Sequence, residues 1–210
     1  MPVIPGVVEL LASEIIHRTA NDLAIVSAAL QTVRREASLA GRREIDALID
    51  RFVANAKINR LLMAPRVHEA FDFPIRLGEL CTAHSEACFA PEGVSLSLTI
   101  DADETVDRNT AWRLLLCVSE LLVSIGKYAI PRGARHIVVS IASAGGQLHC
   151  LVVNDGAVSA SERPSEFSYG AELISSMLAE IHGRLEIRRL GDGMAASIVV
   201  PITRNPTADN

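Results

Sequence analysis

The sequence is short of aromatic residues, of positive charge and of long apolar runs, and each shortage narrows what the protein can be. Phe, Trp and Tyr make up 4% of the 210 residues, whereas hydrophobic residues make up 49%, so the core must be built from aliphatic side chains. The net charge of −5 argues against nucleic acid as a partner, because phosphate backbones are held by a positive excess. The apolar run 114–125 contains Glu120 and is too short to span a bilayer, so we expect no membrane segment.

Cysteine pairs and a signal peptide are missing as well. Cys81, Cys88, Cys117 and Cys150 form no CxxC pair and have no clustered histidines, which predicts reduced, buried thiols and no metal site. Residues 1–6 lack the basic start and apolar core of a signal peptide. We therefore expect a cytoplasmic protein.

Proline is absent between residues 7 and 64, and this region shows helical periodicity. Apolar side chains recur at spacings near 3.6 in the first half, at Val8, Leu11, Ile15, Leu23, Val26, Leu30 and Val33. A break at 38–41 precedes a second stripe over 45–56, and Pro65 ends it. Two long helices with a short connection predict an antiparallel hairpin. Because a lone hairpin cannot cover its apolar stripes, we expect a homodimer built on a four-helix bundle.

The remainder of the chain alternates between helical and strand patterns. We predict helices over 75–90, 107–129 and 170–182, strands over 94–100, 137–142, 148–153, 184–190 and 195–200, and a loop over 157–169. Helices alternating with a mainly antiparallel sheet indicate a two-layer α/β sandwich. The predicted fold class is α+β, with a helical hairpin domain at 1–68, an α/β domain at 69–203 and a loose tail at 204–210.

His17 is the candidate chemical group of the hairpin. On a helical wheel it lies roughly 200° from Ile15, opposite the apolar stripe, so it should point to solvent. A neutral imidazole nitrogen there could act as a nucleophile. Glu14 could accept the proton of the far ring nitrogen, and Arg18 and Asn21 could contact phosphoryl oxygens. An exposed helical histidine among charged residues can also be an ordinary solvated surface.

The neighbourhood of His17 carries a family resemblance. Residues 14–26, Glu-Ile-Ile-His-Arg-Thr-Ala-Asn-Asp-Leu-Ala-Ile-Val, resemble the phosphoacceptor box of sensor histidine kinases with the signature His-Arg-x-x-Asn. The hairpin resembles their dimerisation and phosphotransfer domain, and residues 70–202 are similar in order of elements to their Bergerat-type ATP-binding domain. The resemblance implies that His17 takes up a phosphoryl group.

The ATP-binding half departs from the pattern that it resembles. In 120–129, Glu-Leu-Leu-Val-Ser-Ile-Gly-Lys-Tyr-Ala, Ser124 replaces the family's Mg²⁺-holding Asn. In 153–158, Val-Asn-Asp-Gly-Ala-Val, Asn154 replaces the Asp that accepts the adenine amino group, and Val158 replaces a Gly. In Gly-Ala-Glu-Leu, Glu172 replaces a second Gly, which puts a carboxylate where a triphosphate would lie. These changes predict a domain that kept the fold and binds neither nucleotide nor metal.

The resemblance then implies a histidine phosphotransferase of a bacterial two-component phosphorelay. His17 would carry a phosphoryl group between receiver-domain aspartates without ATP, and the receiver would supply Mg²⁺. The partners would be receiver domains of response regulators or a hybrid histidine kinase. Three alternatives stay open: an active soluble histidine kinase with a variant ATP site, a non-catalytic adaptor that binds a receiver or kinase, and a dimeric α/β protein in which His17 has no special role.

Overall fold

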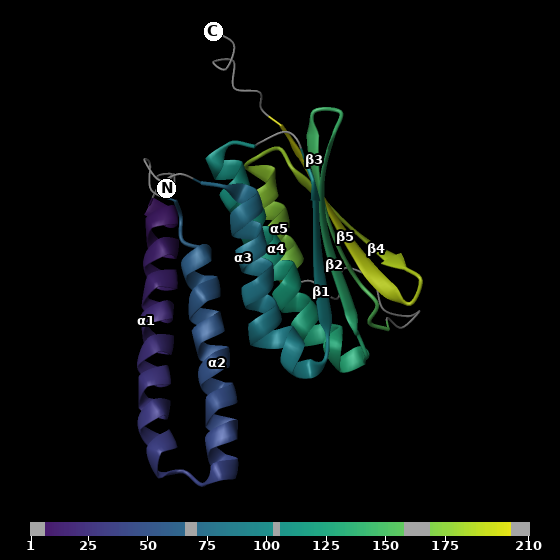
Figure 1. Ribbon diagram of the computed structural model, residues 1–210. Helices are drawn as coiled ribbons and strands as arrows, with labels where there is room; N and C mark the ends of the chain where they lie inside the picture. Colours follow the sequence, from purple (N-terminus) through teal and green to yellow (C-terminus); the bar gives the residue numbers. More distant parts are fainter. Residues whose placement is uncertain (1–6, 66–70, 103–105, 158–168, 203–210) are drawn as a thin grey trace.

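A computed structural model describes residues 7–65, 71–102, 106–157 and 169–202, with a long helical hairpin beside a layered α/β unit (Figure 1). Helices α1 (Val7–Glu36) and α2 (Leu39–Leu61) run antiparallel. The turn between them is set by Ser38, whose side chain accepts a hydrogen bond from the Gly41 N–H at 3.3 Å and so caps α2. Arg34 and Asp46 form an ion pair across the hairpin. The predicted helical hairpin is confirmed.

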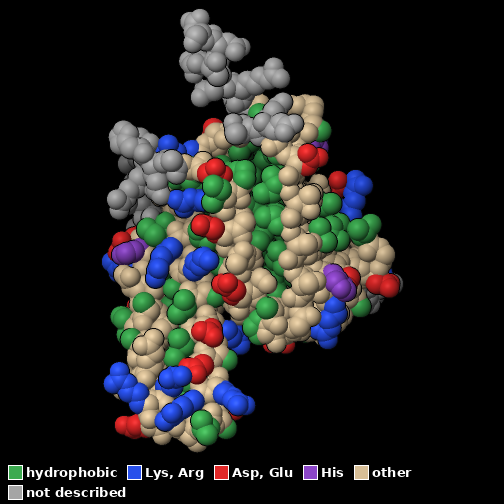
Figure 2. Space-filling view, viewed as in Figure 1, with side chains coloured by type: hydrophobic (Ala, Val, Ile, Leu, Met, Phe, Trp, Pro, Cys, Tyr) green, Lys and Arg blue, Asp and Glu red, His purple; other side chains and the backbone are tan. Residues whose placement is uncertain are grey.

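The two helices pack through small and aliphatic side chains at alternating spacings of three and four. Ala20 and Ser27 of α1 are buried, and Ile16, Leu23 and Leu30 are half-buried beside them. The residues of the apolar stripe predicted from periodicity therefore lie on two faces of α1, one packed against α2 and one exposed. Ile15, Val26 and Val33 lie on a neighbouring face of α1 and remain exposed, with Ile15 at 64%. Figure 2 shows such apolar side chains along the hairpin, interspersed with charged ones.

The second unit is a five-stranded sheet covered on one face by three helices (Figure 1). The helices are α3 (Phe73–His84), α4 (Arg108–Tyr128) and α5 (Tyr169–Ala179), and the strands are β1 (Ser95–Asp101), β2 (His136–Ala144), β3 (Gln147–Asn154), β4 (Arg184–Leu190) and β5 (Gly193–Pro201). The strand order is β1-β2-β3-β5-β4. Strands β1 and β2 are parallel, and the other pairs are antiparallel. This is the predicted two-layer α+β architecture with a mainly antiparallel sheet.

Local sequence signals explain where these elements start and turn. The side chains of Asp72 and Asp107 cap α3 and α4 by accepting hydrogen bonds from backbone N–H groups of the first turn. Gly145 and Gly146 adopt φ values of 59° and 72°, which a two-residue turn between β2 and β3 requires. Short helical turns follow α3 (η1, Ser85–Phe89, and η2, Ala90–Glu92) and α4 (η3, Ile130–Arg132).

Some element boundaries differ from the predicted ones. The predicted helix over 75–90 starts at Phe73 and changes into a π-helical turn at Ser85. The last helix ends at Ala179 rather than 182, because His182 takes a left-handed conformation with φ 54°. Most of the predicted loop 157–169 and the predicted tail 204–210 lie outside the described residues.

One core joins the hairpin to the layered unit. Ala54, Ile58 and Leu61 of α2 belong to the same buried cluster as Leu80 of α3 and Leu115 of α4. The indole N–H of Trp112 in α4 also donates to the carbonyl of Leu62, at 2.9 Å. The end of α2 is therefore part of the core of the second unit, which fixes the direction in which the hairpin leaves it.

The structure also bears on three expectations drawn from composition. All four cysteines are free, and all except the half-buried Cys88 are buried. In the described ranges, no three His, Cys, Asp or Glu side chains come together as metal ligands would. None of the described helices combines the length and apolarity needed to cross a membrane.

Candidate functional site

His17 lies exposed on α1, nearly three helical turns from its first residue Val7, and a hydrogen-bonding contact links its ring to a neighbouring side chain. The amide Nδ2 of Asn21, one helical turn further on, lies 3.3 Å from His17 Nε2. Because an amide N–H can only donate, this contact is a hydrogen bond in the tautomer that has an unprotonated Nε2 and its proton on Nδ1. The lone pair of Nε2 thus faces Asn21 at the protein surface. A nucleophile that reacts with a group on another protein has to be exposed in this way.

Glu14 does not bind the imidazole that it was expected to orient. Its carboxylate accepts a hydrogen bond from Arg18 Nε at 2.7 Å, and no hydrogen bond joins Glu14 to His17. The hydrogen bond and the charge of Arg18 lower the pKa of Glu14 below its ordinary value, and His17 adds a smaller effect in the same direction. Arg18 is 75% exposed in its side chain, so an anion arriving at His17 competes with Glu14 for the guanidinium in water.

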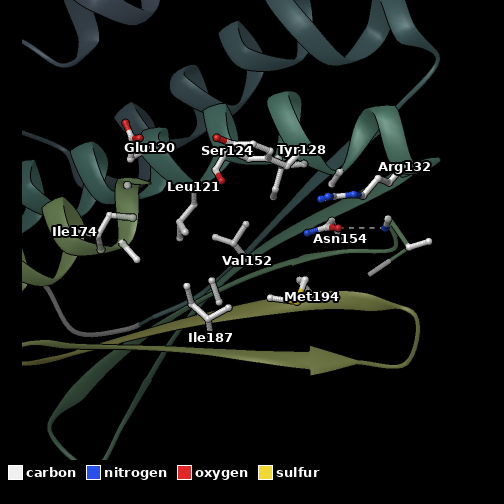
Figure 3. Close-up of a pocket in the computed structure, with 17 residues that line it drawn as sticks. Glu120, Leu121, Ser124, Tyr128, Arg132, Val152, Asn154, Ile174, Ile187 and Met194 are labelled. Carbon is white, nitrogen blue, oxygen red and sulfur yellow. Dashed lines mark hydrogen bonds between the residues drawn. The ribbon is translucent and has the colours of Figure 1, made fainter. Parts of the chain in front are cut away.

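The second candidate site is an open cleft between the helices and the sheet (Figure 3). Its volume is about 680 Å³ when the solvent-filled space at its opening is included. Its walls are mainly aliphatic. Leu121 and Ile125 come from α4, and Ile174 comes from α5. Val152, Ile187 and Met194 form the opposite wall on β3, β4 and β5. A concave site with apolar walls and a few polar groups is typical of a small-molecule site.

Asn154 places a polar group at one end of the cleft. The residue is 7% exposed, and its Oδ1 accepts a hydrogen bond from the Gly156 N–H at 3.1 Å. Since a backbone N–H can only donate, this bond fixes which amide atom faces Gly156. Nδ2 is turned the other way, toward the cavity (Figure 3). The cleft therefore presents a donor at Asn154.

The neighbouring carboxylate of Asp155 does not enter the cleft. Asp155 Oδ1 accepts hydrogen bonds from the backbone N–H groups of Arg135 and His136, and Oδ2 lies 2.7 Å from His136 Nδ1. Desolvation raises the pKa of Asp155, but these hydrogen bonds outweigh it and lower the pKa to about 2. Asp155 stabilises the start of β2, and Asn154 is the residue that lines the cavity.

Glycines let the chain approach closely on two sides of the cleft. A Cβ on Gly156 would lie 2.8 Å from the carbonyl oxygen of Ala129, which shows how closely the end of β3 meets the end of α4. A Cβ on Gly170 would lie 2.7 Å from Oε1 of Glu120. The start of α5 thus packs directly against Glu120, so a carboxylate stands where α5 meets the cleft.

The four residues that depart from the nucleotide-binding pattern in the sequence lie in different parts of the structure. Ser124 and Asn154 line the cleft. Glu172 is exposed and is not among the lining residues, and Val158 lies outside the described residues. An adenine amino group would need an acceptor at Asn154, but Nδ2 offers a donor. In this orientation, the Asn154 amide therefore does not match an adenine amino group.

Periodicity and motif reasoning did not find every residue of these sites. It missed the Glu14–Arg18 ion pair, although the i, i+4 spacing of an acid and a base was a usable signal. It also missed Tyr128 and Arg132, which line the cleft beside Ser124. No local signal identifies them, because a cleft wall depends on which elements meet in space.

Comparisons with known proteins place this architecture among histidine kinases. No protein-family model matches the sequence. The chain is 26% identical over 204 residues to blue-light-activated histidine kinase 2 of Erythrobacter litoralis, an alignment that covers 93% of this chain and 58% of the relative. The chain thus spans somewhat more than half of the length of that curated relative.

Solved structures share the fold over nearly the whole chain. The histidine kinase domain of the Erythrobacter litoralis EL346 blue-light-activated kinase aligns with a TM-score of 0.55 at 21% identity, over 90% of this chain and 94% of that one. A bacterial phosphotransferase aligns with a TM-score of 0.58 at 12% identity, over 94% and 98%. Acinetobacter baumannii histidine kinase AdeS aligns with a TM-score of 0.53 at 13% identity, over 87% and 96%. The chain therefore shares the fold of a histidine kinase domain, with a helical hairpin followed by an α/β unit, and is similar in sequence to a histidine kinase.

Proposed function

We propose that this protein is a histidine phosphotransferase that carries a phosphoryl group on His17 between receiver-domain aspartates and does not use ATP. The observation that carries the proposal is the exposed imidazole of His17, with its unprotonated Nε2 held at 3.3 Å by Asn21 on the solvent side of a phosphotransfer-type hairpin. A nucleophile in that position is open to another protein. Its partners are receiver domains of response regulators or a hybrid histidine kinase, and its location is the cytoplasm.

The transfer step needs little from this chain beyond His17. The Asn21 amide first leaves Nε2, whose lone pair then attacks the phosphorus of a receiver aspartyl phosphate. An N–P bond forms, the P–O bond to the aspartate breaks, and the aspartate leaves as a carboxylate. No proton has to leave the attacking nitrogen, because Nε2 carries none. The Mg²⁺ ion bound by the receiver, together with Asn21 and Arg18, offsets the charge of the phosphoryl oxygens.

The cleft supports transfer without ATP. Asn154 offers a donor where an adenine amino group needs an acceptor. The fold by itself does not decide the activity, since its solved neighbours carry the names of both kinases and a phosphotransferase.

Dimerisation is part of the proposal. Ile15, Val26 and Val33 form an exposed apolar line on α1, and Val53 of α2 is also 56% exposed. Packing this surface against a second copy would remove it from water in a four-helix bundle. Analytical ultracentrifugation should give the mass of two chains, and Val26→Asp together with Val33→Asp should shift it to one. A wild-type mass of one chain would contradict this part of the proposal.

An active histidine kinase is the second candidate. It is favoured by the open cleft itself and by the sequence similarity to a histidine kinase over 93% of this chain. In that case, ATP would bind in the cleft in spite of the Asn154 donor, and His17 would be phosphorylated from it.

One labelling experiment separates the two candidates. The pure protein is incubated with labelled ATP alone and, separately, with a receiver domain carrying a labelled aspartyl phosphate. We expect label to reach the protein from the receiver and none from ATP. His17→Ala should abolish the labelling, while His182→Asn, which changes another exposed histidine and suits its left-handed backbone, should leave it intact. Labelling from ATP alone would favour the kinase.

A further inference from the structure

The sheet has two free edges, and they differ in charge. Strands β1 and β4 end the order β1-β2-β3-β5-β4, and no described strand pairs with the outer side of either. Four of the seven residues of β4 are charged, whereas β1, with the sequence Ser-Leu-Ser-Leu-Thr-Ile-Asp, carries a charge only at its last residue, Asp101. Charges and prolines on an edge strand protect it against the addition of a further strand. Strand β1 has no such protection along most of its length.

The free side of β1 presents backbone groups and apolar side chains from the same residues. The Ser95 N–H donates to the carbonyl of Arg135, which directly precedes β2, at 2.9 Å, so Ser95 turns its backbone groups toward β2. Because these directions alternate along a strand, the N–H and C=O groups of Leu96, Leu98 and Ile100 point outward. Their side chains lie on the helix-covered face but are incompletely covered: Leu96 and Leu98 are half-buried, and Ile100 is 36% exposed.

Helix α3 forms the other side of an apolar strip along this edge. A Cβ on Gly78 would lie 4.0 Å from Cδ2 of Leu98, so α3 faces β1 at a residue without a side chain. Ile75 lies one turn before Gly78 on the same side of α3 and is 61% exposed. We call Ile75, Gly78, Leu96, Leu98 and Ile100 the edge strip. Figure 2 shows apolar side chains open to solvent between α3 and β1. A strand added to β1 would place every second side chain there.

Acidic side chains outnumber basic ones around the edge strip. Glu79 on α3, Glu86 in η1 and Asp101 at the end of β1 are exposed. The guanidinium of Arg76 lies 4.9 Å from the centroid of an aromatic ring, and that of Arg135 donates to a backbone carbonyl at 3.3 Å. A segment with Lys or Arg at its ends therefore complements the charge of this edge better than an acidic segment does.

We propose that β1 is a strand-addition site for an extended segment of a partner protein, in which apolar residues alternate with small polar ones and basic residues stand at the ends. The apolar side chains enter the edge strip, and the polar ones lie beside Ser95, Ser97 and Thr99 on the other face of the sheet. Backbone hydrogen bonds to the free side of β1 supply the affinity. The inference does not rest on phosphotransfer through His17, because β1 and α3 contribute nothing to that site or to the cleft.

A labelled peptide, Lys-Lys-Val-Thr-Val-Thr-Val-Lys-Lys, tests the inference with the unmodified full chain. Fluorescence anisotropy should show saturable binding, and the peptide should slow hydrogen exchange at the amides of Leu96, Leu98 and Ile100. A peptide with the middle reordered to Val-Val-Val-Thr-Thr has the same composition without the alternation and should bind at least about tenfold more weakly. A peptide methylated on its valine and threonine backbone nitrogens keeps the side chains but loses the donors, and it should not saturate at the same concentrations.

Paired charge variants locate the binding site on the protein. Glu79→Lys with Glu86→Lys should weaken binding of the first peptide by about three- to tenfold. Glu36→Lys with Glu44→Lys makes the same change of charge at exposed positions of the hairpin and should have a smaller effect. Because all four positions are exposed, neither pair should disturb the fold.

Several results would overturn the inference. These are equal binding of the reordered or methylated peptide, no binding of the first peptide at millimolar concentration, slowed exchange only at amides outside β1, and equal weakening by the two pairs of variants. Exchange at the β1 amides that slows with rising protein concentration in the absence of peptide would show that a second copy of the chain occupies this edge, and it would also overturn the assignment to a partner protein.

Discussion

Replacing Asn21 should slow phosphoryl transfer far more than replacing Glu14, although both residues flank His17 on the same helix. Asn21 Nδ2 contacts Nε2 at 3.3 Å, so the same amide lies next to the phosphoryl oxygens once the N–P bond forms. A hydrogen bond to a charged group contributes about 1.5–3 kcal/mol. With about 1.4 kcal/mol for each factor of ten in rate, Asn21→Ala should slow transfer by about ten- to hundredfold.

Glu14 is the matched comparison because its carboxylate binds Arg18 and not the ring. Glu14→Gln should therefore change the rate by less than about threefold, since an exposed ion pair contributes little. The assay is the rate of label transfer from a phosphorylated receiver under single-turnover conditions, with circular dichroism to confirm that each variant keeps its helices. A large loss in Glu14→Gln with an unchanged rate in Asn21→Ala would refute the reasoning and restore Glu14 as the residue that orients the imidazole.

Further predictions concern the fold around the two sites. Burial lowers the pKa of His84, whose Nε2 lies 2.9 Å from Ser119 Oγ, from 6.5 to about 4. Because His84 takes up a proton at higher pH in the unfolded chain, the free energy of unfolding should fall by up to about 3 kcal/mol as the pH drops from 6.5 to about 4. Urea titrations at several pH values should show a smaller pH dependence of this free energy in His84→Gln. The same pH dependence in the variant and the wild type would contradict the prediction. Gly156→Ala should lower the free energy of unfolding by roughly 1–3 kcal/mol because its Cβ would clash with Ala129. Gly78→Ala should be neutral or stabilising, because its Cβ would make only an ordinary contact with Leu98 at 4.0 Å. Equal urea midpoints of the two variants would contradict the close approach at Gly156. Native protein treated with a thiol reagent should react fastest at Cys88, because burial raises the pKa of Cys81 and Cys117 to about 12, and faster labelling of either would contradict the buried core.

The hairpin could be predicted from the sequence because a helical period is a local property, but the division of its apolar stripe could not. Which face of α1 meets α2 depends on side chains that let the helices approach, and these are Ala20 and the polar Ser27. Neither contributes to a hydrophobic stripe. Leu23 and Leu30 turn toward α2, and Ile15 is left exposed. Packing, rather than hydrophobicity alone, decides the interface.

The two candidate sites could also be predicted only in part, because local patterns identify residues but not the partners that they bind. Helical spacing predicts that Glu14, Arg18 and Asn21 flank His17 on α1, yet it could not say whether Glu14 would bind the histidine or the arginine one turn along. The motif comparison identified Asn154 as a departure. It could not show that the amide nitrogen faces an open cavity, because the orientation is set by the N–H of Gly156 and the walls come from elements far apart in the sequence.

The most direct test of a relay through His17 is to identify the atom that carries the phosphoryl group. After exposure to a phosphorylated receiver and removal of the receiver, ³¹P NMR of the full chain should show a single phosphoramidate signal, and His17→Ala should show none. Tandem mass spectrometry should place the added mass on His17. A signal that persists in His17→Ala, or one that appears in the wild-type chain with ATP and no receiver, would contradict the account.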